Sequence, residues 1–222
     1  MARKGTKENP LTTEDIDRAK RRTEVMQRVN EKSFDIIKAD IKDDYCNYNY
    51  ELISGPGAGA VHKVTDSTHV IEDSMRKAFI KFNVHLAAIC GAFQFSNIEV
   101  KDIDKFHKHD VTELFTVTGF ELSGTEADPK VRLVGNAYIN ASRGRIEIKT
   151  HKISLDNLGG YQWYSELKKA VDDARLEVAL YKEGFYVPVE EDEEEDPNQT
   201  AMVFEEGNGN GVGHDEFNKG KM

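Results

Sequence analysis

Large apolar residues recur at helical spacing over one long stretch of the chain, from about Ser67 to Phe93. Steps of four, four, three, four, three and four residues separate its members, which are Ile71, Met75, Phe79, Phe82, Leu86, Ile89 and Phe93. A repeat close to 3.6 residues places such side chains on one face of an α-helix. The stretch therefore predicts a long helix whose apolar face packs on the core.

Strand patterns lie on both sides of this helix. In "CNYNYELI", residues 46–53, apolar and polar side chains alternate as they do in a half-buried strand. The glycine-rich "SGPGAGA", residues 54–60, predicts a hairpin loop before a short strand at 62–64. This loop lacks both the Gly-Lys-Ser/Thr ending of a P-loop and the GxGxxG pattern, which disfavours a phosphate-binding role. Three further strands are expected at 114–122, 131–139 and 144–153.

Two more helices complete the expected fold. Thr12 or Thr13 can cap a helix over residues 13–30, and another amphipathic helix runs from about Trp163 towards a C-terminal glycine, Gly184. Both halves of the chain thus contain a meander followed by a long helix, which suggests a βββα unit used twice. We predict an α+β fold in which an antiparallel sheet of about five or six strands packs against two long helices.

The formal charge of −10 is concentrated at one end of the chain. Residues 190–222 hold eleven Asp and Glu and two Lys, a charge of −9, which leaves −1 for residues 1–189. This glycine- and asparagine-rich end cannot bury enough apolar surface to offset its ordering entropy. We expect a flexible arm at 1–10, a single α+β domain at 11–187 and a disordered acidic tail at 188–222.

The helix expected at 13–30 carries a basic cluster formed by Arg18, Lys20, Arg21 and Arg22. Its apolar stripe is narrow and consists of Ile16, Ala19, Met26 and Val29. The helix should therefore pack on another element and not sit inside the core. A solvated surface is the favoured interpretation of the basic cluster, and a phosphate contact is the alternative.

The sequence offers little for catalysis, metal binding or membrane insertion. No run of about 18 apolar residues and no export signal is present, and we expect a cytoplasmic protein. Cys46 and Cys90 lack CxxC spacing and are interpreted as buried thiols. The cluster "DIDKFHKHD", residues 102–110, is favoured as a polar connection over a metal site, and His85 as a hydrogen-bonded structural residue. We predict no catalytic residue, no metal and no cofactor.

The segment at 129–152 has the strongest local positive charge, with six Lys and Arg against Glu147 alone. Strand alternation points its cations outward, and pairing through the "NASR" turn would set Tyr138 opposite Arg145 and Arg132 opposite His151. Cations neutralise phosphates, and an exposed ring can stack on an unpaired base. The predicted nucleic-acid-binding residues are Lys130, Arg132, Tyr138, Arg143, Arg145, Lys149, His151 and Lys152. A solvated strand face with no ligand is the alternative.

These features favour a non-enzymatic accessory protein that binds single-stranded nucleic acid, with single-stranded DNA as the expected ligand. The acidic tail would compete for the basic face and would recruit replication or recombination proteins. Acidic-tailed single-stranded DNA-binding proteins of bacteria and phages are similar in this layout. Their aromatic tip is matched loosely by Phe204 or Phe217, and the terminal "NKGKM" departs from it. A homo-oligomer is compatible with this reading.

Two alternatives belong to other classes of protein. The first is a phage structural or host-interaction protein whose acidic tail keeps it soluble or mimics DNA. The second is a metal-dependent nuclease, because Glu147 and Lys149 form an E-x-K and Asp128 begins the preceding strand, as in PD-(D/E)xK nucleases. The Asp precedes Pro129 where that motif has the reverse order, which weakens the nuclease reading.

A resemblance adds to this reading. The segments "CNYNYEL", "KFNVHLAAICGAF", "VKDIDKFHKHD", "GFELSG", "VRLVGNAYI" and "KISLDN" are similar to those of uncharacterised proteins from phages and mobile elements of Bacteroides-type bacteria. The similarity covers roughly residues 40–185. It implies a phage or mobile-element origin and a working place in the cytoplasm of the bacterial host cell, so phage replication or recombination is the expected setting. It assigns no activity to any position.

Overall fold

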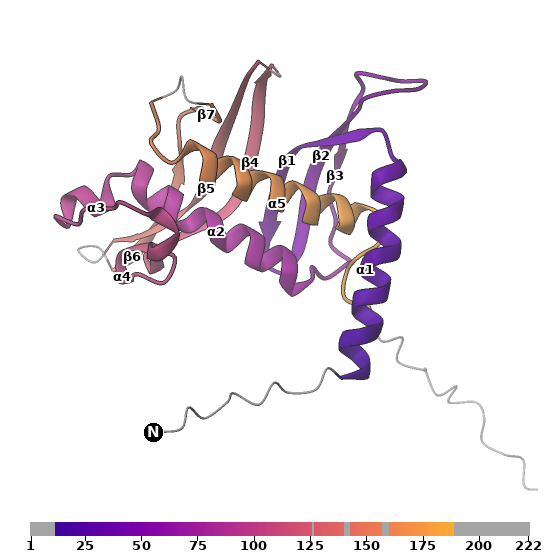
Figure 1. The fold of residues 1–222 in the computed structure, drawn as a ribbon, viewed down its shortest axis with the longest axis horizontal. Coiled ribbons are helices and arrows are strands. Elements are labelled where there is room, and N and C mark those ends of the chain that lie inside the picture. Colours follow the sequence, from indigo (N-terminus) through magenta and orange to yellow (C-terminus); the bar gives the residue numbers. More distant parts are fainter. Residues whose placement is uncertain (1–11, 126, 140–142, 157–159, 189–222) are drawn as a thin grey trace, which may run out of the picture. The chain divides into compact units, whose positions relative to one another are not determined.

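Seven strands form one antiparallel sheet, and the long helices α2 and α5 lie on the same face of it (Figure 1). The computed structural model describes residues 12–125, 127–139, 143–156 and 160–188. The helices are α1 (Thr13–Glu31), α2 (Asp73–Ile89), α3 (Ala92–Phe95), α4 (Asp110–Glu113) and α5 (Tyr164–Lys182), with a 3-10 turn at η1 (Ile103–Phe106). The strands are β1 (Phe34–Lys42), β2 (Tyr45–Leu52), β3 (Val61–Val64), β4 (Phe115–Thr125), β5 (Asp128–Ile139), β6 (Gly144–Lys149) and β7 (Ile153–Ser154).

The α+β architecture predicted from the sequence is confirmed. The strand order is β3-β2-β1-β4-β5-β6, and β7 pairs with β5 beyond β6. Strands β1 to β3 precede α2, and β4 to β7 precede α5, so the two halves meet where β1 lies beside β4. The predicted βββα order thus recurs, with the two-residue β7 as an addition to the second unit. The predicted arm at 1–10 and the predicted acidic tail, apart from Pro188, lie outside the described residues.

Helix α2 supplies much of the core, but it is shorter than its apolar stripe suggests. Met75, Phe79, Phe82 and Leu86 are buried, as predicted. The helix begins at Asp73 and not near Ser67, because the Asp66 carboxylate accepts the backbone N–H groups of Thr68 and His69 and folds this segment into a turn. It ends before Gly91, whose positive φ of 72° breaks the helix ahead of α3.

Strand β1 is a central strand that the periodicity did not identify. Ile36 and Ala39 are both buried against the helices, although they are three residues apart. A bulge between Ile36 and Lys38 inserts one residue and shifts the alternation. The period-two pattern of "FDIIKADIK" is therefore broken in the middle of the strand.

Helix α1 is held mainly by ion pairs. Its cap is Thr12, which exchanges hydrogen bonds with Asp15 in a capping box. Val25 is the buried residue of this helix and packs on Leu180 and Phe185, whereas Ile16 of the predicted stripe is 43% exposed. The prediction of an apolar stripe is therefore wrong for the N-terminal half of this helix.

The three arginines of the basic cluster on α1 form ion pairs with buried carboxylates, whereas Lys20 is exposed as the solvated-surface interpretation predicts. Arg18 and Arg21 pair with Glu72 at 2.6 and 2.5 Å, and Glu72 is only 6% exposed. Arg22 donates to both carboxylate oxygens of Glu177, which also accepts from Ser74 at 2.7 Å. These arginines therefore attach α1 to the N-terminus of α2 and to the C-terminal half of α5. Neither interpretation of the sequence anticipated this contact.

The remaining interior features agree with expectation. Cys46 is fully buried and Cys90 is half-buried, and burial raises the pKa of the Cys46 thiol to about 12. Helix α5 ends at Lys182, with Gly184 at a positive φ of 101°. Within the described ranges no helix combines the length and apolar character that a bilayer crossing requires.

His85 lies inside the core of α2 as the predicted hydrogen-bonded histidine. It is 1% exposed, and its Nδ1 lies 2.9 Å from the Tyr161 hydroxyl oxygen. Burial, together with the positive charge of the nearby His107, lowers the pKa of His85 to about 3. His85 is therefore protonated below about pH 6.5 in the unfolded chain, but only near pH 3 in the folded chain.

We predict that this histidine makes the fold acid-sensitive. The free energy of unfolding should decrease as the pH falls from about 6.5 towards 3, with a contribution from His85 of up to about 1.4 kcal/mol per pH unit. Urea unfolding at several pH values should show a shallower dependence in His85→Gln than in the wild type. The exposed His62, changed to Gln, is the control and should leave the slope unchanged. Equal slopes in all three proteins would contradict the assignment.

Candidate nucleic-acid interface

A groove crosses the face of the sheet that α2 and α5 leave open. Its volume is about 460 Å³, within the range of ligand sites. All six strands from β3 to β6 contribute to it, mostly with polar side chains from outward positions. These polar residues are Lys38, Asp40, Asn47, Asn49, Lys63, Thr65, Glu147 and Lys149.

The floor of the groove is the junction between the two βββα halves. Residues Lys38–Asp40 of β1 pair with Gly119–Glu121 of β4, and this is the whole of the β1–β4 ladder. A Cβ on Gly119 would lie 2.7 Å from the Ala39 carbonyl oxygen and 2.9 Å from Asp40 Oδ1. The Asp40 carboxylate therefore lies over a position where only glycine leaves it room.

Charges of both signs line this groove. Lys149 Nζ lies 3.0 Å from Glu147 Oε1, while Asp40 has no ion pair among the described residues. Burial raises the pKa of the Asp40 carboxyl, Lys38 and a hydrogen bond with the Thr118 side chain lower it, and Glu147 raises it. The groove thus holds three lysines, two asparagine amides and one carboxylate that no cation neutralises directly.

The structure brings part of the predicted binding set together. Tyr138 pairs with Arg145 across β5 and β6, as predicted, and Tyr138 is 38% exposed. Val134, four residues earlier on β5, pairs with Lys149 at the groove. At about 3.3 Å per residue, the Tyr138–Arg145 pair lies about 13 Å from the groove along the same strand.

The predicted pairing of Arg132 with His151 is wrong. The paired residues pass from Val134–Lys149 to Val131–Ile153. The three residues between Lys149 and Ile153 therefore lie opposite only two residues of β5. Thr150 causes this break, because its Oγ1 accepts the backbone N–H of Leu133 at 3.0 Å. His151 and Lys152 are exposed in the resulting loop and leave the strand face.

The local excess of positive charge is smaller than the sequence count suggests. Lys130 pairs with Asp128 at 2.7 Å, Arg132 lies 3.6 Å from Glu121, and Lys149 pairs with Glu147. Asp128 and Glu121 lie outside 129–152, so a charge count over that segment left them out and included Glu147 alone. Of the six cations in segment 129–152, Arg143, Arg145 and Lys152 are exposed and have no ion pair to a described residue.

The carboxylates of the nuclease interpretation are far apart. Asp128 pairs with Thr125, whereas Glu147 pairs with Asn136, eight residues further along β5. Eight residues of strand span about 26 Å, so the two side chains cannot hold one metal ion. Among the described residues no three His, Cys, Asp or Glu side chains are grouped as metal ligands.

The "DIDKFHKHD" segment forms a polar connection. Its residues fold into η1 and α4, and His109 Nδ1 accepts the backbone N–H of Val111 as an N-terminal cap. His107 lies 3.5 Å from Asp104 and lines a small polar pocket with Lys81 and His85. This hollow is about 240 Å³ in volume, about half that of the groove on the open face.

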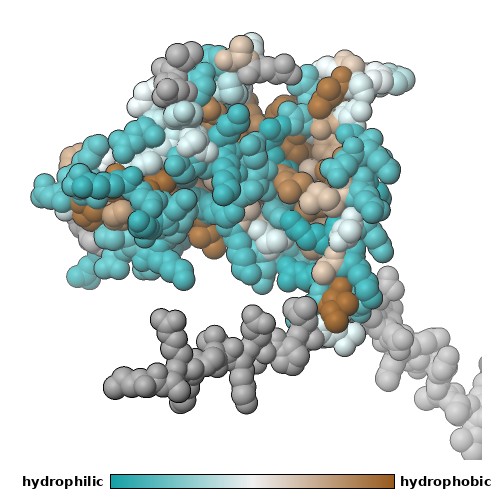
Figure 2. Space-filling model, in the orientation of Figure 1, coloured by the Kyte–Doolittle hydropathy of each residue, from teal (hydrophilic) through white to brown (hydrophobic). Residues whose placement is uncertain are grey.

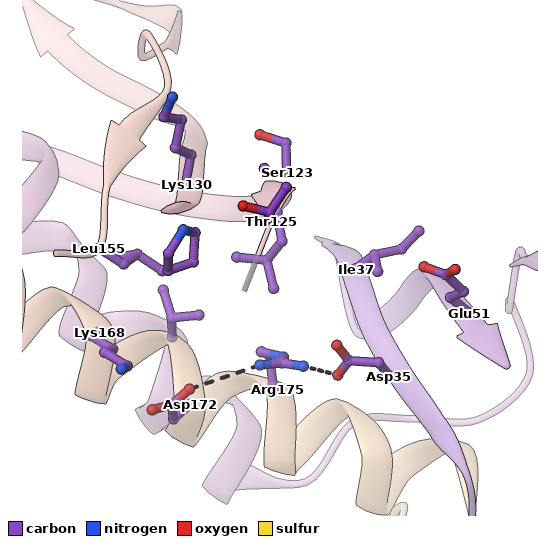
Figure 3. A pocket seen from close by; sticks show the side chains of 14 residues that line it. Asp35, Ile37, Glu51, Ser123, Thr125, Lys130, Leu155, Lys168, Asp172 and Arg175 are labelled. Atoms are coloured by element: carbon purple, nitrogen blue, oxygen red, sulfur yellow. Dashed lines mark ion pairs between the residues drawn. The ribbon is translucent and has the colours of Figure 1, made fainter. Parts of the chain in front are cut away.

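A second cleft opens where the β1–β4 ladder stops (Figure 3). Both strands continue beyond Lys38 and Glu121 without pairing to each other, and α5 forms the floor of the space between them. The cleft has a volume of about 480 Å³. Lys130, one of the predicted binding residues, lines this cleft and does not line the groove.

Arg175 of α5 stands in the middle of the cleft. Its Nε donates to the Ile36 carbonyl oxygen at 3.2 Å, and its guanidinium pairs with Asp35 and lies 3.9 Å from Asp172 (Figure 3). The arginine therefore donates a hydrogen bond to a β1 carbonyl group at a point where β4 no longer pairs with β1. Ser123 Oγ, on the β4 side, is buried without a hydrogen-bond partner among the described residues.

The helix-bearing side is mainly hydrophilic (Figure 2). Its large exposed apolar side chains, Ile80 on α2 and Phe95 on α3, occur singly, as is usual for a protein surface. We therefore find the stronger candidate site on the open face of the sheet.

Sequence reasoning missed most of the residues that line the groove. Lys38 and Asp40 lie on β1, which the broken alternation concealed. Asn47 and Asn49 were identifiable as the polar positions of "CNYNYEL", and Lys63 as the polar position of the next strand. What the sequence could not supply is the strand order that places these residues beside Lys149.

Comparison with protein-family models, with curated proteins and with solved structures finds no match to this chain. The assignment of the site therefore rests on its geometry alone.

We predict that Arg175 stabilises the splayed junction. Arg175→Met should lower the free energy of unfolding by about 1–3 kcal/mol, because the Ile36 carbonyl oxygen and Asp35 lose their charged donor. Arg76 pairs with Asp44 on the surface, and Arg76→Met is a matched control that should cost less than about 0.5 kcal/mol. Urea denaturation measures both values. Similar small losses in the two variants would show that the cleft does not depend on Arg175.

Proposed function

We propose that this chain binds single-stranded nucleic acid across the open face of its sheet, as a non-enzymatic accessory protein. The observation that carries the proposal is the single groove that crosses all six strands and holds Lys38, Lys63 and Lys149. These lysines come from β1, β3 and β6, so cations are spaced along the path that a polyanion would follow. Lysines at such positions neutralise phosphates and release counterions.

The same face offers side chains that can contact unpaired bases. Asn47 and Asn49 present amides in the groove, and Tyr138 presents a half-exposed ring beside Arg145 about 13 Å away along β5. Aromatic rings stack on bases of any sequence, and amides hydrogen-bond to base edges that a duplex would occupy. This combination favours a single strand over a double helix.

The acidic C-terminal segment supports a self-competition model. Residues 190–222 carry a charge of −9 and are tethered to the domain that holds the groove. A tethered polyanion reaches the basic face at roughly millimolar effective concentration and must be displaced by nucleic acid. The same segment would be free to recruit replication or recombination proteins once displaced. A phage or mobile-element setting is part of this proposal and rests on the sequence resemblance.

We predict that the groove lysines dominate the affinity. The triple variant Lys38→Gln, Lys63→Gln, Lys149→Gln should bind a dT20 oligonucleotide about 10- to 100-fold more weakly at low salt. The slope of log K against log salt concentration should flatten by about 2, since each phosphate contact on a single strand contributes about 0.7. Fluorescence anisotropy over a salt series measures both quantities.

The matched control removes three lysines from the other side of the domain. Lys77 lies on α2, Lys169 on α5, and Lys108 in the connection after η1, and all three are exposed. Lys77→Gln, Lys108→Gln, Lys169→Gln changes the net charge by the same amount and should alter the affinity by less than about twofold. If both triple variants lose affinity equally, the effect is one of net charge and the groove is not the site.

We predict that removing residues 190–222 strengthens binding. The truncated chain should bind dT20 at least about fivefold more tightly than the full chain at low salt, because it lacks the intramolecular competitor. The difference should shrink as salt screens both interactions. Equal affinity of the two proteins at every salt concentration would contradict the competitor role and leave the segment as a solubilising or partner-binding end.

A further inference from the structure

Asp40 differs from three other carboxylates of the central and edge strands β4 to β6. Glu121, Asp128 and Glu147 each lie within 4 Å of a lysine or arginine, at 3.6, 2.7 and 3.0 Å. Asp40 has no such ion pair in the described part of the chain. The Asp40 carboxylate accepts a hydrogen bond from the Thr118 side chain. Because a carboxylate can accept about four hydrogen bonds, Asp40 retains acceptor capacity at the floor of the groove.

The space above Asp40 exists because of Gly119. The carboxylate oxygen Oδ1 would lie 2.9 Å from a Cβ at that position, so any side chain there would displace it. Asn47 lies directly across from Asp40 on β2, and its Oδ1 already accepts the backbone N–H of Asp66 at 3.2 Å. Its amide nitrogen therefore remains available as a donor beside the Asp40 acceptor.

An ionised carboxylate is best satisfied by two adjacent N–H donors held in one plane. Among the four bases, only guanine presents such a pair, N1–H and the N2 amino group, on its Watson–Crick edge. That edge is accessible in a single strand and is occupied in a duplex. We propose that Asp40 selects guanine within the bound single strand, accepting from N1–H and N2–H, while Lys38, Lys63 and Lys149 hold the flanking phosphates.

This inference deepens the proposed function and rests on it. An arginine side chain of a partner protein offers the same pair of donors, and it is the rival ligand. The three lysines around the groove disfavour a cationic peptide and favour a polyanion. The nucleic-acid reading is therefore the one that the charges support.

The experiment measures the affinity of the full chain for dT12 and for the same strand with one central dG, by fluorescence anisotropy at low salt. The guanine strand should bind about tenfold more tightly, as expected for one bidentate carboxylate contact. Replacing dG by deoxyinosine, which lacks the N2 amino group, should remove most of this preference. Binding of dT12 with no guanine preference overturns the inference and leaves the proposed function intact, whereas binding of neither strand overturns both.

Protein variants locate the preference at Asp40. Asp40→Asn replaces one acceptor by a donor and should lose the guanine preference while it still binds dT12. Glu51→Gln removes an outward carboxylate of β2 that lies outside the groove and should keep the preference. A preference that survives in Asp40→Asn overturns the assignment. So does Asp40-dependent binding of an arginine-rich peptide that is tighter than binding of the guanine strand.

Discussion

The structure depends on one short contact, the three-residue ladder that joins β1 to β4. Lys38–Asp40 and Gly119–Glu121 are the residues through which the two βββα halves share a sheet. A Cβ on Gly119 would meet the Ala39 carbonyl oxygen at 2.7 Å, so this approach requires glycine. Gly135 on β5 is under the same constraint, since a Cβ there would lie 2.3 Å from the Thr116 carbonyl oxygen.

Both hollows of the sheet follow from this junction. At the ladder itself the strands lie close together, and the outward side chains of the two halves line one groove. Beyond the ladder the strands separate, and Arg175 occupies the space with its donors on Ile36 and Asp35. The bulges in β1 and β4 flank the ladder on both sides, and bulges increase local bending and twist. The site is thus a property of how the halves join and not of either half alone.

The sequence predicted the fold class because its strongest signals come from regular, one-sided burial. The stripe of α2, the alternation of "CNYNYEL" and the capping glycine after α5 all reflect contacts with a single core. The prediction failed where an inserted residue changes the register of a strand, or where an ion pair between distant residues decides how an element packs. The bulge at Ile36–Lys38 concealed β1, Thr150 broke the ladder expected for Arg132, and Glu72 and Glu177 turned a surface cluster into a docking contact.

The candidate site shows the same division. Tyr138 and Arg145 were predictable because a hairpin fixes its own register, whereas Lys38, Asp40 and Lys63 join the groove only through the strand order.

The most direct test of the account is a nitrogen-15 NMR titration of the full chain with dT12. The account predicts shifts of the side-chain amides of Asn47 and Asn49 and of the backbone amides around Gly119, with α2 and α5 unchanged. Shifts confined to the helices, or none at saturating oligonucleotide, would contradict it.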